Sequence, residues 1–472
     1  MTLPAKFVER VLRDLGETEG AALCAALDAE PPVSVRLNPA KTGAETVSAG
    51  PDAGLPVPEA AGLPALAIAG RVPWSRDGRY LAVRPSFTLD PDFHAGAYYV
   101  QEASSQFVGH LLAAVRTEGA RILDLCAAPG GKTTLYASLA DGLVVANEIA
   151  RRRASVLADN VRKWGTGNVA VTTCEPRALG DFEAWFDVVA VDAPCSGEGM
   201  FRKDPDARGE WSEGNVKQCA ARQDEILREA WRALRPGGTL VYSTCTFNRD
   251  EDEGALERMA AWAGDEIAES EETAVEDAWG IVCGRVGAFR TFRFYPHRTC
   301  GEGFFAAVAR KSFDAGGRVR APKARRTVFA AVDRKTAGEL ARWVRNPGGM
   351  HFAAVADTCY AWYAAQADAV RTLSEALPVI YSGVALGQVF KGVLKPDPAL
   401  AFFDGLNRGA LPAAELDDEE TLRFLRRQDI AAGGLAEGMN LVCSRGRALG
   451  FAKRIGARVN NLYPNSLRII KQ

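Results

Sequence analysis

The chain has 472 residues, 47% hydrophobic and 25% charged, a length that favours about two to four domains. Its apolar runs fall short of the ~20 residues of a membrane helix, and the charged N-terminus, MTLPAKFVERVLRDL, lacks the apolar core of a secretory signal. Ten dispersed cysteines without a CxxC pair, and only four histidines, argue against a disulfide framework and a zinc site. We therefore expect a cytoplasmic protein with free thiols and no metal.

The formal net charge of −2 hides an uneven distribution. Residues 250–277 hold 12 of the 59 acidic side chains but only one of the 57 basic ones, Arg258. We interpret this stretch as a solvated helix face or loop. The remainder of the chain is net basic, so it could still present a groove for nucleic acid.

The pattern of apolar and polar residues divides the chain into four regions. Residues 1–92 mix helix-like segments with turns rich in proline and glycine, which predicts a small α/β lobe. Between 93 and 311, short apolar runs alternate with amphipathic stretches, as in a mostly parallel, doubly wound sheet with helices between the strands. The runs are RILDLCAAP, LVVANE, NVAVTTC, FDVVAVDAP, TLVYSTC and FFAAVAR.

Two of the helices between these strands are predicted from residue spacing. Ala150, Ala154, Leu157, Val161 and Trp164 recur at steps of three and four residues, which places them on one face against the sheet. Residues 215–234 repeat this pattern and stop at an Arg-Pro-Gly-Gly sequence that leads into the next strand.

The last part of the chain begins after a basic linker at 312–330, which contains SFDAGGRVRAPKARR. A further region, 331–472, follows. Its end, 440–472, has seven lysines and arginines, no acid and several turn-rich short strands. We expect this end to contact phosphate groups.

The stretch LDLCAAPGGKTT looks like a phosphate-binding loop, but its spacing does not fit. That motif needs a glycine five residues before Gly131, where this chain has Cys126. What remains is a glycine turn after the first strand, with Glu148 at the end of the second. A carboxylate there can accept both hydroxyls of a ribose, which suits an adenosine ligand without a pyrophosphate, such as S-adenosylmethionine. The alternative is that the glycines only form a tight turn.

Cys195 and Cys245 each follow directly on a predicted strand. Because the carboxyl ends of parallel strands converge, we expect both thiols and Asp192 to meet beside the glycine turn. A thiolate added at C6 of a cytosine would activate C5 for methylation, and a carboxylate could hold N3 or the exocyclic amine. A nearby backbone donor could lower the pKa of either thiol. The remaining cysteines, apart from Cys126, are expected to be inert.

Five segments together resemble the NOL1/NOP2/Sun family of RNA cytosine-5 methyltransferases. They are QEASSQ (101–106), DLCAAPGGKT (124–133), NE followed by an arginine-rich helix (147–153), DAPCSGEGMFRKDPD (192–206) and RPGGTLVYSTCTF (235–247). The resemblance implies a Rossmann-like class I methyltransferase domain at 93–311 and an N-terminal RNA-binding lobe. The tail, LGFAKRIGARVNNLYPNSLRI (449–469), resembles the PUA-like extension of the bacterial 16S rRNA branch of this family.

The resemblance also implies roles for individual residues. Cys245 would be the attacking thiol, and Cys195 would assist release of the product. Glu175 stands near where the family often has an aspartate for the adenine amine, and it could substitute. The positions that match the family's cofactor contacts are Cys126, Ala127, Ala128, Pro129, Gly130, Gly131, Lys132, Glu148 and Asp192.

Several basic residues are candidates for contact with RNA, although exposed lysines and arginines often only remain hydrated. They are Arg36, Arg202, Lys203, Lys453, Arg454 and Arg458. The leading hypothesis is a monomeric enzyme that methylates C5 of a cytosine in 16S rRNA. A tRNA substrate, and a non-catalytic RNA-binding or ribosome assembly factor, are the alternatives.

Overall fold

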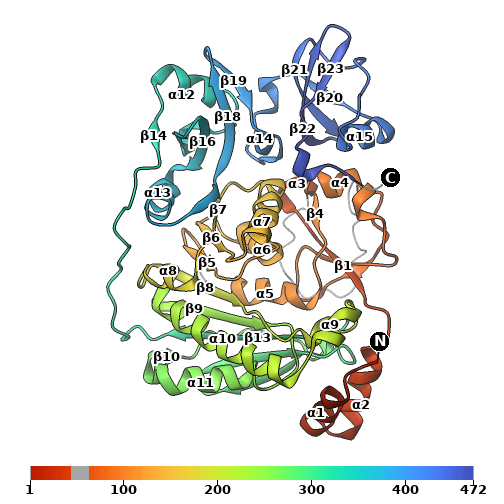
Figure 1. Ribbon diagram of the computed structural model, residues 1–472, viewed down its shortest axis with the longest axis vertical. Coiled ribbons are helices and arrows are strands. Elements are labelled where there is room, and N and C mark those ends of the chain that lie inside the picture. Colours follow the sequence, from red (N-terminus) through yellow and green to blue (C-terminus); the bar gives the residue numbers. More distant parts are fainter. Residues whose placement is uncertain (1, 44–62, 116, 471–472) are drawn as a thin grey trace.

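The computed structural model describes residues 2–43, 63–115 and 117–470. A helical hairpin, α1 (Ala5–Leu15) and α2 (Glu17–Ala26), precedes a small antiparallel sheet in the N-terminal lobe (Figure 1). The strand order of this sheet is β2-β3-β1-β4. Its strands are β1 (Val33–Leu37), β2 (Ile68–Arg71), β3 (Gly78–Leu81) and β4 (Tyr98–Tyr99).

The central sheet has ten strands, and its core is parallel as predicted. The order is β11-β12-β13-β9-β8-β5-β6-β7-β17, with β10 paired to β13. Strands β5 to β9 run parallel to one another, and β13 is antiparallel between β9 and β12. The parallel strands are β5 (Ile122–Asp124), β6 (Val144–Asn147), β7 (Val169–Thr172), β8 (Phe186–Asp192) and β9 (Leu234–Thr244). The others contributed by this region are β10 (Ile267–Ala268), β11 (Val282–Val286), β12 (Phe289–Phe294) and β13 (Phe304–Lys311).

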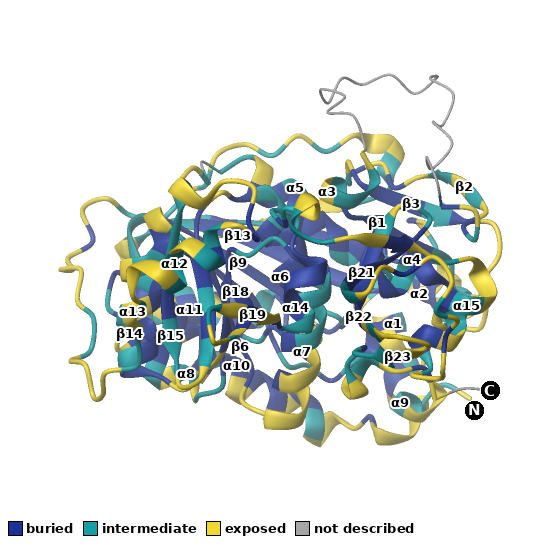
Figure 2. Ribbon diagram, turned by 90° about the horizontal axis from the view of Figure 1, so that it is seen from above, coloured by how far each residue is buried: buried dark blue, intermediate teal, exposed yellow. Residues whose placement is uncertain are grey.

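Helices cover both faces of this sheet, and each face has its own hydrophobic core. One core contains residues of α5 (Phe107–Ala113), α6 (Gly131–Leu139) and α7 (Arg151–Trp164). The other contains residues of α8 (Pro176–Gly180), α10 (Glu213–Ala233) and α11 (Glu253–Ala263). In Figure 2 the strands of the sheet are buried and the exposed residues lie mainly in outer turns and loops. Burial on both faces explains why these strands read as continuous apolar runs.

The predicted face of α7 is confirmed except at its first position. Ala154, Leu157, Val161 and Trp164 are buried, whereas Ala150 is exposed and caps the helix rather than packing on the sheet. A residue at the N-cap has left the helical repeat, so spacing alone misplaces it.

The C-terminal half is connected to the central sheet by strand pairing as well as by the linker. Strand β17 (Val379–Ser382) pairs antiparallel with β7, so that Tyr381 lies opposite Val171. The linker at 312–330 runs extended along the molecule, and its Arg320 and Arg325 amides donate to the carbonyls of Glu183 and Glu375. The edge of the catalytic sheet is therefore closed by a strand from a different region.

Two smaller sheets complete the C-terminal half (Figure 1). The first contains β14 (Ala330–Ala331), β15 (Met350–Val355), β16 (Thr358–Tyr363), β18 (Val384–Phe390) and β19 (Val393–Pro396). The second contains β20 (Ala413–Glu415), β21 (Gly438–Ser444), β22 (Arg447–Ile455) and β23 (Arg458–Asn461). Their helices are α12 (Arg334–Ala341), α13 (Ala367–Ala376), α14 (Pro398–Phe402) and α15 (Asp418–Leu425). Within the described ranges, no helix is long and apolar enough to cross a membrane.

Candidate active site

The two cysteines that follow β8 and β9 lie in contact at the carboxyl edge of the central sheet. The Sγ atoms of Cys195 and Cys245 are 3.1 Å apart, and the backbone amide of Cys245 donates to the Cys195 sulfur at 3.4 Å. Both are free thiols and both are partly exposed. The parallel pairing of β8 with β9, from Phe186 to Asp192, is what aligns the two strand ends. The predicted meeting of these two residues is confirmed.

The environment of Cys195 favours its protonated form. The hydrogen bond to Cys245, together with burial, raises the pKa of Cys195 well above its ordinary value. The expectation that a backbone donor would lower the pKa of this thiol is wrong for Cys195, because the neighbouring sulfur and burial outweigh the amide. The Cys195 thiol therefore keeps its proton, and its S–H can be shared with the neighbouring sulfur.

Asp192, at the end of β8, forms an ion pair beside these thiols. Its Oδ2 is 2.8 Å from Nζ of Lys132, and its Oδ1 accepts a hydrogen bond from Ser243 at 2.9 Å. Burial opposes the charge on Lys132, but the Asp192 carboxylate and the nearby Cys245 sulfur raise the pKa of Lys132 overall. Lys132 is therefore held in its charged form beside the carboxylate of Asp192.

A buried polar network joins the loop that carries Cys195 to the loop that carries Cys245. Glu251 accepts from the Ser196 amide and from Gln223, while Asn248 donates to Ser196, Glu198 and Glu251. Glu198 in turn accepts from the amide of residue 247. Because one loop carries Cys195 and the other Cys245, this network sets the distance between the thiols.

Two residues near the start of the acidic stretch at 250–277 belong to buried polar clusters. The interpretation of the whole stretch as a solvated face is therefore wrong for these two. Glu251 and Asp252 are both 0% exposed. Asp252 accepts from Thr244 and lies 2.9 Å from Nη1 of Arg293, and burial raises the pKa of its carboxyl well above the usual range. Composition alone could not distinguish these two residues from the exposed acids that follow them.

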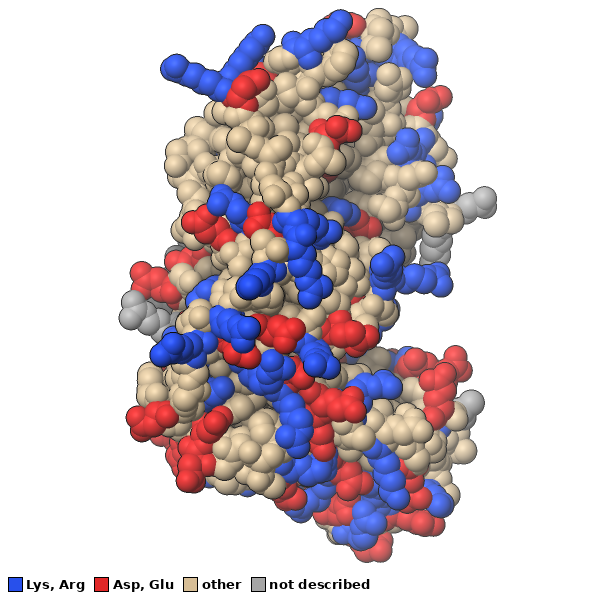
Figure 3. All heavy atoms as spheres, turned by 60° about the vertical axis from the view of Figure 1, so that its left-hand side comes forward, with Lys and Arg blue, Asp and Glu red and all other residues tan. Residues whose placement is uncertain are grey.

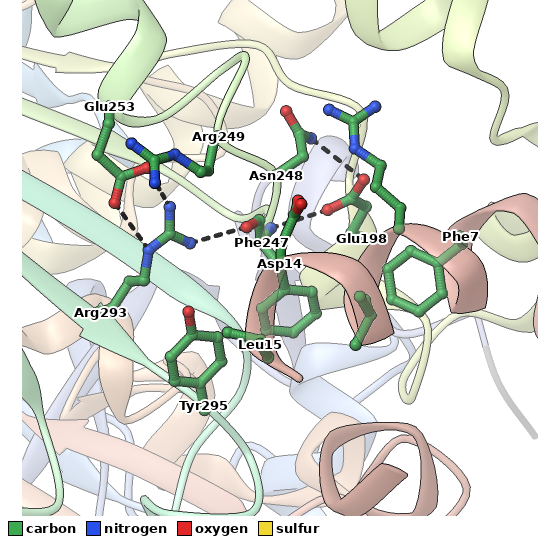
Figure 4. A pocket seen from close by; sticks show the side chains of 12 residues that line it. Phe7, Asp14, Leu15, Glu198, Phe247, Asn248, Arg249, Glu253, Arg293 and Tyr295 are labelled. Carbon is green, nitrogen blue, oxygen red and sulfur yellow. Dashed lines mark hydrogen bonds and ion pairs between the residues drawn. The ribbon is translucent and has the colours of Figure 1, made fainter. Parts of the chain in front are cut away.

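The helical hairpin of the N-terminal lobe packs against the same two loops. The ring of Phe7 on α1 lies 5.0 Å from Phe201, which follows Cys195, and 6.4 Å from Phe247, which follows Cys245. A cavity of about 120 Å³ opens beside this contact. Figure 4 shows that residues of α1 line it together with Phe247, Arg293 and Tyr295. The thiols themselves do not line this cavity.

The glycine turn after β5 has the shape and charge for a cationic adenosine ligand. Gly130 has φ of +112°, and a Cβ there would lie 3.0 Å from Leu157, so only glycine fits. Asp124, Asp192 and Glu148 all lie close enough to Cys126 to add to the effect of burial in raising the pKa of its thiol. Three carboxylates would repel a phosphate, whereas they stabilise a sulfonium or an ammonium group.

Asp124 contributes an orphaned acceptor to this turn. The residue is 0% exposed, its Oδ2 accepts from Thr133 at 2.6 Å, and its Oδ1 has no hydrogen-bond partner among the described residues. Burial raises the pKa of Asp124 to about 7. An unsatisfied buried carboxylate is a feature that a bound cation or donor would satisfy. The residues present therefore fit S-adenosylmethionine.

Glu148 directly follows β6 and is buried. Its carboxylate accepts from the Ala150 amide and lies 3.1 Å from Arg153, which also donates to the Ala128 carbonyl at 2.8 Å. Reasoning from the sequence misses Arg153, although three arginines in the first turn of α7 oppose the helix dipole and are a signal for a site. Glu175 is exposed at the N-cap of α8, and its side chain makes no capping hydrogen bond.

Three of the predicted RNA contacts have guanidinium groups that are hydrogen-bonded within the protein, which argues against them as contacts to RNA. Arg36 is 0% exposed and donates to Gln101, Thr134 and the Gly131 carbonyl. Arg202 pairs with Glu302 at 2.9 Å, and Arg454 donates to the carbonyls of residues 432 and 435.

The other three candidates keep exposed side chains. Lys203 lies on the loop beyond Cys195, and Lys453 and Arg458 lie on neighbouring strands of the last sheet. The structure leaves these three available to a ligand.

Comparison with known proteins places these features in a family. Residues 111–310 match the family model described as 16S rRNA methyltransferase RsmB/F. Residues 3–103 match the N-terminal domain of 16S rRNA methyltransferase RsmF, and residues 412–469 match the methyltransferase RsmF PUA domain.

Individual relatives agree with these matches. Ribosomal RNA small subunit methyltransferase F from Shewanella loihica is 32% identical over 418 residues, covering 84% of this chain and 83% of the relative. The protein of the same name from Escherichia coli is 33% identical over 425 residues, covering 84% of each chain. A methyltransferase homologue from Pyrococcus horikoshii has a similar structure, with a TM-score of 0.52 and 27% identity over 65% of this chain and 94% of that one. The chain therefore belongs to the RsmB/F family of 16S rRNA methyltransferases.

Proposed function

We propose that this protein transfers a methyl group to C5 of a cytosine in 16S rRNA through a covalent bond between Cys245 and C6 of the base. The observation that carries the proposal is the contact between the two thiols, with the proton held on Cys195. Bound S-adenosylmethionine would supply an electrophilic methyl group at the glycine turn. Its adenosine would be held by Glu148 and the turn from Cys126 to Lys132, with Glu175 in reach of this pocket.

The residues at the carboxyl edge divide the chemistry between them. The Cys245 thiolate adds to C6, and the electron pair of the C5–C6 double bond moves to C5. C5 can then form a bond to the methyl carbon as the bond from that carbon to the sulfonium sulfur breaks and the sulfur keeps its electron pair. The carboxylate of Asp192, held by Lys132 and Ser243, accepts a hydrogen bond from the base. Loss of the C5 proton to solvent returns an electron pair to the ring and expels Cys245, whose departing sulfur receives the hydrogen bond of the Cys195 thiol.

The rest of the molecule would hold the RNA around this edge. We assign this role to the N-terminal lobe (1–92) and to the C-terminal region (331–472), with Lys203, Lys453 and Arg458 as contacts to phosphates. The proposed site of action is the cytoplasm, where a 16S rRNA substrate is found, and the proposed active form is the monomer.

The test is to trap the covalent intermediate. With S-adenosylmethionine and a 16S rRNA transcript, Cys195→Ala should accumulate a protein–RNA adduct that survives a denaturing gel, because product release is impaired. Cys245→Ala should form no adduct and transfer no methyl group. Cys283→Ala, which removes an exposed thiol on β11, is the matched control and should behave as the unaltered protein does.

The outcomes separate the alternatives. Methyl transfer by Cys245→Ala would overturn the assignment of the nucleophile. Adducts with tRNA but not with 16S rRNA would identify the other substrate class. A complete lack of methyl transfer to either RNA or to small ribosomal subunits would favour a non-catalytic binding factor. Bisulfite sequencing of the product would identify the cytosine.

A further inference from the structure

The hairpin formed by β18 and β19 ends in a turn whose sequence is unfavourable for its conformation. The two turn residues, Lys391 and Gly392, have φ of +50° and +81°. A two-residue turn with both φ values positive favours Asn-Gly or Gly-Gly, because a side chain such as lysine is strained there. A residue that breaks a local rule without structural benefit is a candidate for function.

A similar turn elsewhere shows what structural benefit looks like. Arg445 and Gly446, between β21 and β22, also have positive φ values. There the guanidinium of Arg445 lies 3.2 Å from Asp90 and 2.9 Å from Asp92, which offsets the strain. By contrast, Lys391 makes no salt bridge with any described residue, and its Nζ lies 5.5 Å from the centre of the Phe390 ring.

The hairpin tip exposes an apolar pair. Phe390 and Val393 lie directly opposite each other, so their side chains share one face of the two strands. They are 71% and 65% exposed. Next along the same face are Gln388 and Lys395, also an opposed pair and both exposed. A flat aromatic ring is therefore presented to solvent between two lysines.

A third lysine approaches from helix α12. A Cβ placed on Gly392 would lie 3.5 Å from Nζ of Lys335, so this ammonium is beside the turn. Two acids of this region are already engaged: Asp333 accepts from the Thr336 amide as the cap of α12, and Glu339 accepts from the Leu394 amide and pairs with Arg342. Within the described part of the chain, Lys335 and Lys395 also form no salt bridge. In Figure 3, basic side chains project from the upper end of the molecule, where the C-terminal sheets lie.

We propose that this hairpin tip, Phe390 with Lys335, Lys391 and Lys395, is a docking surface for RNA. Stacking of an unpaired base on the Phe390 ring and contact of the three ammonium groups with flanking phosphates account for both features of the tip. An acidic protein would match the charge but would not require a bare, flat ring. The inference deepens the proposed function, since it rests on an RNA substrate and assigns a surface outside residues 412–469.

The position of the tip determines which kinetic constant it affects. It lies in the upper part of Figure 1, away from strands β8 and β9, whose ends carry the two thiols. It can therefore touch only RNA that lies outside the reacting base. Weakening it should raise Kd and KM for RNA and leave kcat at saturating RNA unchanged.

The sharpest test is Lys391→Asn, because asparagine suits this turn better than lysine. We expect its Tm to be equal or higher and its RNA affinity to be lower, with the slope of log K against log salt reduced by about one. Phe390→Ala should weaken binding by roughly tenfold, and combining it with Lys335→Gln and Lys395→Gln should weaken it further. Arg371→Gln on α13, which removes an exposed cation of the same half, is the control and should bind normally.

Binding is measured by filter retention with unmodified 16S rRNA and with small ribosomal subunits, so that the result does not depend on methyl transfer. Loss of affinity on either probe supports the proposal even if the assignment of the methylated base fails. Unchanged affinity and salt slope on both probes, in variants that remain folded, would overturn it while leaving the proposed chemistry intact. Dimer formation through the tip, abolished by Phe390→Ala without loss of RNA affinity, would also overturn it.

Discussion

The charged groups at the catalytic edge of the sheet and those on the C-terminal sheets have opposite environments. Near the thiols, Arg36, Arg202 and Arg293 are buried and hydrogen-bonded to other parts of the chain. On the C-terminal sheets, Lys391 and Lys453 remain exposed. The difference shows that an arginine close to a catalytic motif in sequence often supports the site instead of contacting the substrate. Apart from Lys203, the candidate cations that stay exposed lie on the C-terminal sheets.

The largest effect is expected from Arg202→Met, which removes one of the arginines that are engaged inside the protein. It would leave Glu302, whose side chain is 3% exposed, without its main partner, and a buried charge left alone costs about 3–5 kcal/mol. Urea unfolding should show this loss. The neighbouring Lys203→Met should cost less than about 1 kcal/mol, because its ammonium is more exposed and 3.9 Å from Glu302. Similar losses in free energy of unfolding for both variants would show that the two cations do not differ in their structural role.

Asp124→Asn should change how stability depends on pH. The pKa of Asp124 is raised to about 7, so the folded protein keeps a proton there that the unfolded chain loses near pH 4. In the unaltered protein this group lowers stability progressively as pH rises from about 4 to about 7, by roughly 4 kcal/mol at most. The asparagine variant lacks this loss, so its relative stability should increase over that window. A pH-independent difference in free energy of unfolding would contradict the assignment.

Asn248→Ala should affect both stability and rate. The amide joins the loops that carry Cys195 and Cys245, and its removal leaves buried acceptors on Ser196, Glu198 and Glu251 with fewer donors. We expect a loss of about 1–3 kcal/mol and a fall in kcat of at least tenfold, because the thiols are no longer held in contact. Asn215→Ala, on the outer part of α10, is the control. A variant that loses stability but keeps kcat would show that the network does not position the thiols.

The smallest effects are expected from substitutions of exposed cations on the C-terminal sheets. Lys453→Ala and Arg458→Ala should each change stability by less than about 0.5 kcal/mol and reduce the salt slope of RNA binding by about one. Arg454→Ala lies between them in sequence but should behave differently, because its guanidinium braces the loop at 432–435. It should lower Tm without changing the salt slope. The opposite pattern would mean that Arg454 faces the RNA.

Sequence predicts the parts of this molecule that depend on local pattern. The strands ending at Asp192 and Thr244 were visible as apolar runs, and parallel topology alone was enough to bring Cys195 and Cys245 together. The comparisons confirm the family and the fold. Repeating side-chain periods and the convergence of strand ends are properties of short segments, so they can be inferred without the tertiary structure.

The errors arose where the environment is set by distant residues. Arg202 is paired with Glu302, which is 100 positions away, and Arg36 donates hydrogen bonds to Gln101 and Thr134. Glu251 and Asp252 looked like part of a solvated acidic stretch, but their partners come from the loop after β8 and from β12. No local pattern reports which charged side chain will meet its counterion inside the protein.

Strand β17 makes the catalytic sheet depend on a segment about 200 residues further along the chain than the strand it covers. A fragment ending at the linker would leave the backbone of β7 unpaired along an open edge, and such an edge recruits other chains. We therefore expect that the portion carrying the thiols cannot be separated at the linker unless another strand first covers the edge of β7. The same pairing anchors the chain between the two parts of the first C-terminal sheet on the sheet that carries the thiols, so a shift of one would be transmitted to the other.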